Sequence, residues 1–452
     1  MNRVLALLLD TLMLLPAPAK ISNDPPDVDI VAPYYIVVDA EDPSIVYYER
    51  DPDEHCIPAS TMKIMTCILT LEHVTDYDEP VVVTKQAANL KESNSLMDVY
   101  AGETLSVNDL LHGLMLVSGN DAALLLATHV AGSVAAFSEL ANAKAAELGM
   151  VNSHFVNASG AFRGTQYSTA RDMALLMAYA LKNEKFREII STAKYTIEAN
   201  GVRKKADVLE NSNRLISDDP STSDVYTELC IGGKTGSTVN GGKCLVAAGA
   251  LDGAEVIVVL IGAEDATSYD MHRRMPKVFG NAKFLLEYTL ENSYTQVTPA
   301  SLDFTYSTEV TPTGAASSFS VSAQFDEDAV RRLPNDMAKA LAADPSSIEV
   351  TTELEEDLAD AKAGDAVGTI SCSYEGRALF NGELIADTDA LPTPTPTLAL
   401  PESTPEPPAD AETGSFFSGL HIGVYVFGGL SVLLCISLIV LVVLKIRRGA
   451  RL

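Results

Sequence analysis

The chain has 452 residues, too many for one ordinary domain, so we expect two or more. Its hydrophobic fraction of 47% is ample for globular cores, and its formal net charge of −29 disfavours nucleic acid and anionic membrane faces as partners. The 7 histidines include no H-E-x-x-H motif and the 6 cysteines fit no zinc-binding spacing, which argues against a zinc enzyme.

The first 19 residues have the pattern of a secretory signal peptide. A positive charge at Arg3 precedes the apolar run 4–9, which Asp10 interrupts, and Ala17-Pro-Ala19 fits an A-x-A cleavage site. We therefore expect residues 1–19 to be removed and the remaining chain to leave the cytoplasm.

Two apolar stretches, 34–38 and 45–48, flank a polar segment and predict a strand–turn–strand unit. A dense apolar run follows Ser60 and predicts a buried helix that begins near this residue. Lys63 comes three positions after Ser60, so both side chains would share one face of the helix. The amine of Lys63 would then be within reach of the Ser60 hydroxyl.

The S-x-x-K spacing of Ser60 and Lys63 is weak evidence by itself, because Ser191 and Lys194 have the same spacing. The two pairs differ in context. Ser191 follows Phe186-Arg-Glu-Ile-Ile190 at an expected helix end, and no buried run comes after it. We therefore expect a chemical role for Ser60 and Lys63 and none for Ser191 and Lys194.

Residues 86–182 have a mostly helical pattern, which is broken at Ser118-Gly119-Asn120. The glycine lets the backbone turn at this break, so the side chains of Ser118 and Asn120 can face a cleft. We expect the next residue, Asp121, to cap the helix that follows.

Three strands are predicted next, at 230–237, 243–251 and 255–262, and a helix at 277–290 closes the unit. We expect the 34–48 hairpin to share a mainly antiparallel sheet with these strands, with helices packed on the sheet. The predicted fold class is therefore α+β.

A hairpin turn is expected at Asn240-Gly-Gly242, directly after the K-T-G motif 234–236. This turn would place Cys244 opposite about residue 237, far along the strand from Cys230. We therefore expect no disulfide between Cys230 and Cys244.

The character of the chain changes after the catalytic unit. Short alternating stretches within 295–388 predict a small β-rich domain, and a proline-rich stretch at 389–416 predicts an extended linker. Residues 422–444 carry no charge and are long enough to span a bilayer, and the basic tail 445–452 follows at once. Because positive flanks face the cytoplasm, we expect a single-pass membrane protein with the bulk of the chain outside the cell.

The three motifs together carry the chemistry. They supply a serine nucleophile (Ser60), a candidate lysine base (Lys63), a second hydroxyl (Ser118) and a cation for a carboxylate (Lys234). That set is what acyl transfer to a serine needs when no catalytic histidine takes part.

With these motifs the chain resembles the serine-type D-alanyl-D-alanine carboxypeptidases, the low-molecular-mass penicillin-binding proteins. The resemblance covers about residues 30 to 390. It implies a penicillin-binding or β-lactamase-like transpeptidase fold for a catalytic domain at 28–291, followed by the family's β-rich domain. The segments Gly232-Gly233 and Asn157-Ala-Ser-Gly-Ala161 depart from the family's pattern, and we expect these departures to leave the catalytic residues unchanged and to bear on substrate-side detail.

The resemblance also implies catalytic roles. Ser60 would attack the carbonyl between two terminal D-alanines of a peptidoglycan stem peptide and become an acyl-ester. Lys63 would take the serine proton, which requires a neutral amine, and burial near the cation of Lys234 would lower its pKa. Ser118 would pass a proton to the leaving D-alanine. No metal or cofactor is implied.

Substrate-binding roles follow in the same way. Asn120 would hold the peptide and orient Lys63, while Lys234 and the Thr235 hydroxyl would bind the terminal carboxylate. The backbone N–H groups of Ser60 and Ser237 would form the oxyanion hole, and Gly236 would also belong to the substrate-binding residues. β-Lactam antibiotics would act as inhibitors by acylating the same serine.

Three alternatives stay open. A D,D-endopeptidase acting on peptidoglycan cross-links would use the same residues. A class A β-lactamase would need a glutamate some 35 residues after the second motif, but residues 151–156 contain none. A non-catalytic wall-binding protein would not need the complete set of motif residues.

Overall fold

The computed structural model describes residues 28–390 except the segments 91–94, 162–163, 217–224, 265–276, 312–317, 327–328, 356–357 and 359. The predicted signal peptide, transmembrane segment and cytoplasmic tail lie outside the described residues, as does all but the start of the predicted linker.

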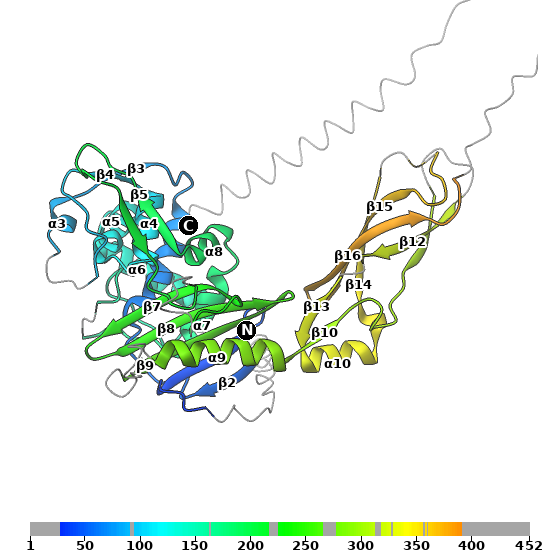
Figure 1. The fold of residues 1–452 in the computed structure, drawn as a ribbon, viewed down its shortest axis with the longest axis horizontal. Helices are drawn as coiled ribbons and strands as arrows, with labels where there is room; N and C mark the ends of the chain where they lie inside the picture. The colour runs from blue at the N-terminus through cyan, green and yellow to red at the C-terminus, as the bar shows by residue number, and fades with distance from the viewer. Residues whose placement is uncertain are drawn as a thin grey trace, which may run out of the picture. The chain divides into compact units, whose positions relative to one another are not determined.

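A five-stranded antiparallel sheet forms the centre of the catalytic domain, with strand order β2-β1-β9-β8-β7 (Figure 1). The strands are β1 (Tyr34–Asp39), β2 (Val46–Arg50), β7 (Cys230–Thr238), β8 (Gly242–Leu251) and β9 (Ala254–Ala263). The first hairpin therefore shares a sheet with the three later strands, as the sequence predicts. In β7 and β8 the residue opposite Cys244 is Gly236, and Cys230 lies opposite Gly249. The two cysteines are therefore far from cross-strand neighbours, and both are free thiols.

The alternation of side chains along β1 explains why helices cover both faces of the sheet. Ile36 and Val38 belong to one buried hydrophobic core, whereas Tyr35 and Val37 belong to a second core on the opposite face. Helix α9 (Lys277–Asn292) packs on β8 and β9 and closes the second core. A larger set of helices closes the first.

Four helices of the first core begin at a polar side chain that caps them. Ser106, Ser133, Thr169 and Asn183 each accept a hydrogen bond from the backbone N–H three residues later and so cap a helix. The helices on this side are α2 (Lys63–His73), α3 (Lys85–Ala88), α4 (Val107–Met115), α5 (Asn120–Ala131), α6 (Val134–Glu147), α7 (Ala170–Ala180) and α8 (Glu184–Ser191). Two small two-stranded antiparallel sheets accompany them, β3 (Pro80–Val82) with β4 (Thr104–Ser106) and β5 (Lys194–Ile197) with β6 (Asp207–Glu210).

A third hydrophobic core lies wholly within residues 297–390, the stretch for which a β-rich domain is predicted. Its main sheet has strand order β11-β12-β16-β15-β14 and all its described pairings are antiparallel. The elements are β10 (Tyr294–Val297), β11 (Ser307–Val310), β12 (Phe319–Phe325), β13 (Arg331–Pro334), α10 (Asn335–Ala343), β14 (Glu349–Leu354), β15 (Ala366–Tyr374) and β16 (Arg377–Ala386). Glu375 and Gly376 form the turn between β15 and β16.

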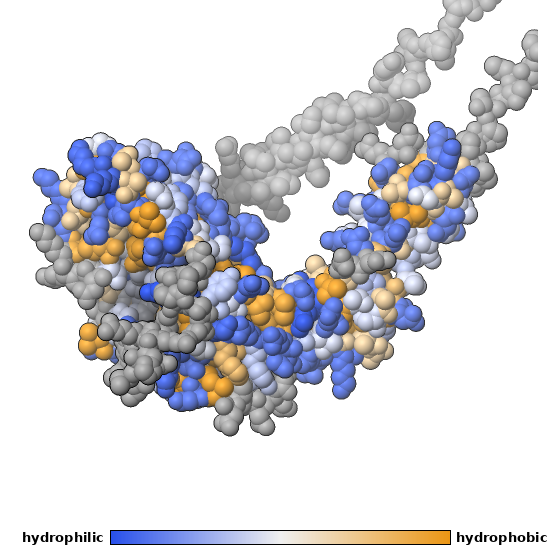
Figure 2. Space-filling view, in the orientation of Figure 1, coloured by the Kyte–Doolittle hydropathy of each residue, from blue (hydrophilic) through white to orange (hydrophobic). Residues whose placement is uncertain are grey.

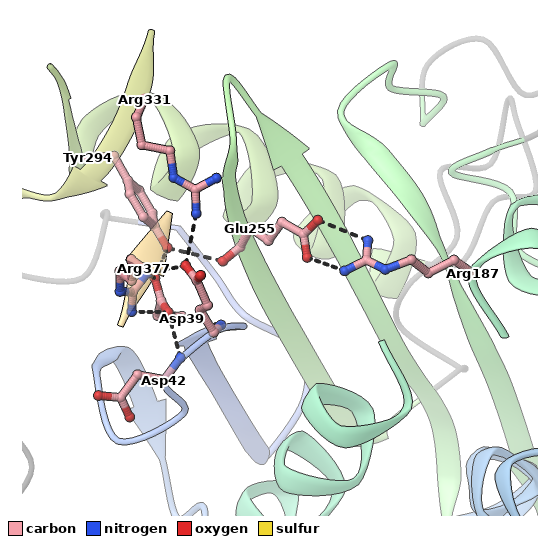
Figure 3. Close-up of polar contacts among 8 residues, drawn as sticks. Asp39, Asp42, Arg187, Glu255, Tyr294, Arg331 and Arg377 are labelled. Carbon is pink, nitrogen blue, oxygen red and sulfur yellow. Dashed lines mark hydrogen bonds and ion pairs between the residues drawn. The ribbon is translucent and has the colours of Figure 1, made fainter. Parts of the chain in front are cut away.

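Buried charges join this β-rich domain to the catalytic sheet (Figure 3). Asp39, at the end of β1, is fully buried and accepts hydrogen bonds from the guanidinium of Arg377 at 2.6 and 3.1 Å. The hydroxyl of Tyr294 donates to the same carboxylate at 2.7 Å. Glu41 accepts hydrogen bonds from both Arg377 and Arg331 at 2.9 Å. This network gives hydrogen-bond partners and an opposite charge to the carboxylate of Asp39, which would be costly to bury without them.

In Figure 2 hydrophilic residues predominate on the face shown, with hydrophobic residues scattered among them in smaller groups. Within the described residues no single helix is both long and apolar enough to cross a membrane; α5 and α6 meet those criteria only as a pair bent by 81°.

Candidate active site

Ser60 and Lys63 lie at the start of the central helix of the domain. Residues Ala59–Met62 form a 3-10 turn, η1, and the α-helix α2 begins at Lys63. The predicted helix therefore exists, but Ser60 lies on the tighter turn that precedes it. Across this turn the Nζ atom of Lys63 is 3.0 Å from the Oγ atom of Ser60, which is the contact that the S-x-x-K spacing predicts.

Lys63 is surrounded by three oxygen atoms. Besides Ser60 Oγ, its Nζ atom lies 2.7 Å from Asn120 Oδ1 and 2.6 Å from the carbonyl oxygen of Ser159. These two carbonyl-type oxygens can only accept hydrogen bonds. A neutral amine has two protons to give them, and its lone pair is then left for the hydroxyl proton of Ser60. The contacts thus suit a lysine that acts as a base toward Ser60.

The electrostatic environment favours this neutral form. The side chain of Lys63 is fully buried, and burial is the main cause that lowers its pKa well below the usual range. The nearby charge of Lys234 lowers the pKa of Lys63 further, while Asp121 acts in the opposite direction. Burial and the charge of Lys234 therefore both lower the pKa of Lys63, as predicted.

The segment 157–161 positions the carbonyl group that binds Lys63. Asn157 Oδ1 accepts the backbone N–H groups of Ser159 and Gly160 at 3.0 and 2.8 Å, and Asn157 Nδ2 donates to the carbonyl of Ala161 at 2.9 Å. This segment, whose departures from the family's pattern are expected to bear on substrate-side detail, thus also forms one wall around the candidate base.

Gly160 allows that wall to approach the nucleophile. It has φ +79, and a Cβ atom at this position would lie 1.8 Å from the carbonyl oxygen of Ala59, the residue before Ser60. Ala59 itself has a positive φ of 50. Any side chain at 160 would therefore displace the turn that carries Ser60.

Ser118 and Asn120 occupy the break between α4 and α5, as the sequence predicts. Ser118 has φ 61, an uncommon conformation for a residue with a side chain, and such strain often occurs at functional sites. Its buried hydroxyl has no hydrogen-bond partner among the residues that the structure describes. Asn120 begins α5, and its backbone N–H donates to the carbonyl of Ser95 at 2.9 Å.

Asp121 is not the N-cap residue of α5, contrary to expectation, because Gly119 has that position. One oxygen of the buried Asp121 carboxylate does accept the backbone N–H of Ala122, in the first turn of the helix, at 2.9 Å. The carboxylate also accepts the backbone N–H groups of Met97 and Val99 at 3.0 and 3.3 Å. Asp121 thus ties the segment before α4 to the motif that holds Ser118.

The edge strand β7 supplies Lys234, Thr235, Gly236 and Ser237. Lys234 is fully buried, and burial lowers its pKa to about 7. Its Nζ atom donates to the carbonyl of Thr235 at 2.9 Å. Protonated Lys234 therefore carries a positive charge with little internal compensation, which suits a group that binds an anion.

Gly236 brings β7 against the backbone of the nucleophile. A Cβ atom on Gly236 would lie 3.1 Å from the backbone nitrogen of Ser60 and 3.2 Å from the carbonyl oxygen of Pro58. The strand and the turn η1 are thus in close backbone contact at the site where an oxyanion hole is expected. The structure brings together Ser60, Lys63, Asn120 and the β7 residues, although these are far apart in sequence.

Comparison with known proteins identifies relatives of this chain. A family model described as D-alanyl-D-alanine carboxypeptidase matches residues 19–265. The D-alanyl-D-alanine carboxypeptidase DacF of Bacillus subtilis is 32% identical over 222 residues, which cover 48% of this chain and 54% of that protein. The chain thus spans about half the length of this relative. DacC of Escherichia coli is 30% identical over 348 residues, which cover 75% of this chain and 80% of DacC.

Solved structures share the fold. The D-alanyl-D-alanine carboxypeptidase DacD of Francisella tularensis aligns with 83% of this chain and 96% of its own, with a TM-score of 0.52 at 23% identity. A DD-transpeptidase of Streptomyces aligns with 58% of this chain and 98% of its own, with a TM-score of 0.51 at 28% identity. The family model matches more than half of the chain, including all three motifs, and the chain belongs to the D-alanyl-D-alanine carboxypeptidase family.

Proposed function

We propose that this chain removes the terminal D-alanine from peptidoglycan stem pentapeptides through an acyl-serine intermediate. The observation that carries the proposal is the placement of Lys63. Its buried amine lies 3.0 Å from Ser60 Oγ and has two further oxygen partners that only accept hydrogen bonds. Family membership supports the same reaction and supplies the substrate class.

In the acylation step, Ser60 Oγ attacks the carbonyl carbon of the penultimate D-alanine while its proton passes to Lys63 Nζ. The C–N bond of the tetrahedral intermediate then breaks. The proton held by Lys63 passes through the hydroxyl of Ser118 to the nitrogen of the departing D-alanine. At the end of this step Ser60 is esterified, and the Ser118 hydroxyl has the same protonation state as at the start.

Two groups of donors stabilise the charges of the substrate. The backbone N–H groups of Ser60 and Ser237 face the developing oxyanion, and each such donor typically contributes a few kcal/mol to the transition state. The Lys234 cation and the Thr235 hydroxyl bind the terminal carboxylate, and Asn120 holds the peptide. The close contact between Gly236 and the Ser60 backbone supports this arrangement.

Deacylation completes the cycle. A water molecule attacks the ester carbonyl and gives its proton to Lys63, and the C–O bond to Ser60 breaks. Lys63 then returns the proton to Ser60 Oγ, which regenerates the free serine. A β-lactam presents a reactive amide carbonyl to the same serine, so we propose that β-lactam antibiotics acylate Ser60 and inhibit the enzyme.

We also propose a location for this reaction. The uncharged run 422–444 followed by the basic tail 445–452 supports a single membrane span, with the catalytic domain on the extracellular side. The peptidoglycan substrate would be found on that side. Both the span and the orientation rest on the sequence alone.

The test is D-alanine release from an acyl-D-Ala-D-Ala peptide by the purified protein, with Ser60→Ala as the matched variant. We expect release by the wild type and none by the variant. Absence of release from folded wild-type protein would contradict the proposal. Cleavage of cross-linked dimers without release from the monomeric peptide would favour the endopeptidase alternative. For the location, resistance of the catalytic domain to protease added outside intact cells would contradict an extracellular position.

A further inference from the structure

A serine outside the three motifs contacts the K-T-G strand. The Oγ atom of Ser212 lies 2.7 Å from the Oγ1 atom of Thr235, and either hydroxyl can be the donor. Both residues are half-buried. Ser212 lies 23 positions before Thr235 in the chain and follows the short strand β6, so no local motif links the two residues.

The segment that carries Ser212 is held from both sides. Asn211 donates from its backbone N–H to the carbonyl of Ala193 at 2.8 Å and from Nδ2 to the carbonyl of Thr192 at 3.0 Å. The backbone N–H of Ser212 donates to the carbonyl of Leu116 at 3.0 Å. Because Leu116 ends α4 just before Ser118, Ser212 connects the serine motif of one wall to the K-T-G strand of the other.

The direction of the hydrogen bond decides what Ser212 does. A threonine hydroxyl has one proton to donate. If Thr235 gives that proton to a substrate carboxylate, its contact with Ser212 requires Ser212 to be the donor. A hydroxyl that accepts one hydrogen bond while donating another is also a better donor, because the two bonds polarise each other.

We propose that Ser212 is a positioning residue that orients the Thr235 hydroxyl toward the terminal carboxylate of the substrate. It selects for a free carboxylate without touching the substrate itself. This inference rests on the proposed role of Thr235 in binding that carboxylate.

The test measures kcat and KM for an acyl-D-Ala-D-Ala peptide with wild type, Ser212→Ala, Thr235→Val and the double variant. We expect Ser212→Ala to lower kcat/KM about three- to tenfold, mainly through KM, as the loss of one neutral hydrogen bond implies. In the Thr235→Val background, Ser212→Ala should have no further effect. Ser212→Thr keeps the hydroxyl and should restore most of the activity.

Ser138 provides a matched control. It is a buried serine whose hydroxyl donates to the carbonyl of Val134 at 2.9 Å within α6, away from the motifs. Ser138→Ala should leave KM unchanged, and melting temperatures of all variants report on folding. A purely structural role of Ser212 would lower the melting temperature and kcat together and leave KM unchanged.

The outcomes separate this inference from the proposed function. Effects of Ser212→Ala and Thr235→Val that simply multiply would overturn the inference, because Ser212 would then act independently of Thr235. An unchanged KM in Ser212→Ala, with a raised KM in Thr235→Val, would also overturn the inference and leave the carboxylate site intact. An unchanged KM in Thr235→Val would remove the carboxylate role of Thr235 and, with it, the role of Ser212. Absence of D-alanine release by the wild type would contradict the proposed function itself.

Discussion

The Nζ atom of Lys63 lies 2.6 Å from the carbonyl oxygen of Ser159, a residue that belongs to none of the three motifs. Together with Asn120 Oδ1, this carbonyl accounts for both protons of a neutral amine. The geometry that makes Lys63 a base toward Ser60 therefore depends on a segment about one hundred residues away in sequence. Several measurements can test that arrangement and the structure around it.

The first prediction uses the duplicate S-x-x-K spacing as an internal control. Lys63→Met removes the proposed base, so kcat/KM for D-alanine release should fall by roughly 10²- to 10⁴-fold. Acylation by a labelled penicillin should slow with it. Lys194, which is exposed and pairs loosely with Glu210 at 3.7 Å, has the same spacing from Ser191. Lys194→Met should retain wild-type rates, and a comparable loss in that variant would contradict the assignment.

The second prediction concerns pH. Activity requires neutral Lys63 and, for carboxylate binding, protonated Lys234. The rate constant kcat/KM should therefore fall on the acid side as Lys63 gains its proton. On the alkaline side it should fall as Lys234 loses its proton, near its lowered pKa of about 7 in the free enzyme. A bound carboxylate favours the cation, so the alkaline limb of kcat should lie at higher pH than that of kcat/KM.

Lys234→Arg tests which group causes the alkaline limb. Arginine stays protonated over the whole accessible range, so the limb should disappear from the kcat/KM profile while the acid limb remains. The measurement is a pH–rate profile of D-alanine release for both proteins. An alkaline limb that is unchanged in Lys234→Arg would assign it to another group.

The third prediction compares two glycines with almost the same backbone conformation. Gly160 has φ +79 and Gly149 has φ +75, but only a Cβ atom on Gly160 would meet a neighbour, the carbonyl oxygen of Ala59 at 1.8 Å. Gly149→Ala should cost about 1–2 kcal/mol of stability from backbone strain alone and keep full activity. Gly160→Ala should also shift the Ser60 turn, and a displacement of about 1 Å can cost 10²-fold in rate.

Melting temperature and penicillin acylation, measured on both glycine variants, separate strain from displacement. Equal acylation rates in the two variants would show that the close approach of Gly160 to Ala59 is not needed for the chemistry. A slower rate in Gly160→Ala alone is the expected result.

The fourth prediction concerns the buried charges between the two domains. Arg377→Met leaves the fully buried carboxylate of Asp39 without its cation, which should cost about 3–5 kcal/mol in urea-induced unfolding. Arg332 is the matched control, because its partner Asp252 is 46% exposed and Arg332→Met should cost at most about 1 kcal/mol. Adding Asp39→Asn to Arg377→Met should recover part of the loss. A double variant less stable than the single one would contradict this explanation.

The sequence predicts the parts of this molecule that depend on local patterns. The strands of the central sheet, the helix after Ser60 and the break at Ser118 follow from hydrophobic periodicity and turn residues, and Lys63 reaches Ser60 within one turn. Cross-strand register could be predicted because the hairpin turn at residues 240–242 fixes it: Cys244 lies opposite Gly236, one residue from the expected position.

The parts that sequence reasoning missed depend on contacts between distant segments. The carbonyl of Ser159 is a backbone group, so no residue type marks it, and its contact with Lys63 spans 96 positions. Asp121 is expected to cap α5, but Gly119 is the N-cap residue, and the Asp121 carboxylate also binds the backbone of Met97 and Val99, more than 20 positions away. Gly160 was the one available signal, since a glycine beside an asparagine turn can mark a close backbone approach.

The pairing of Asp39 with Arg377 limits how this protein can be divided. Cutting the chain after α9 would give a fragment with every catalytic motif, but it would also remove Tyr294 and Arg377 from the carboxylate at the end of β1. Because β1 pairs directly with β9 in the catalytic sheet, the unpaired carboxylate of Asp39 would lie inside the domain that the fragment is meant to preserve. A fragment for crystallisation or inhibitor screening should therefore extend through β16, or carry Asp39→Asn if it must end earlier.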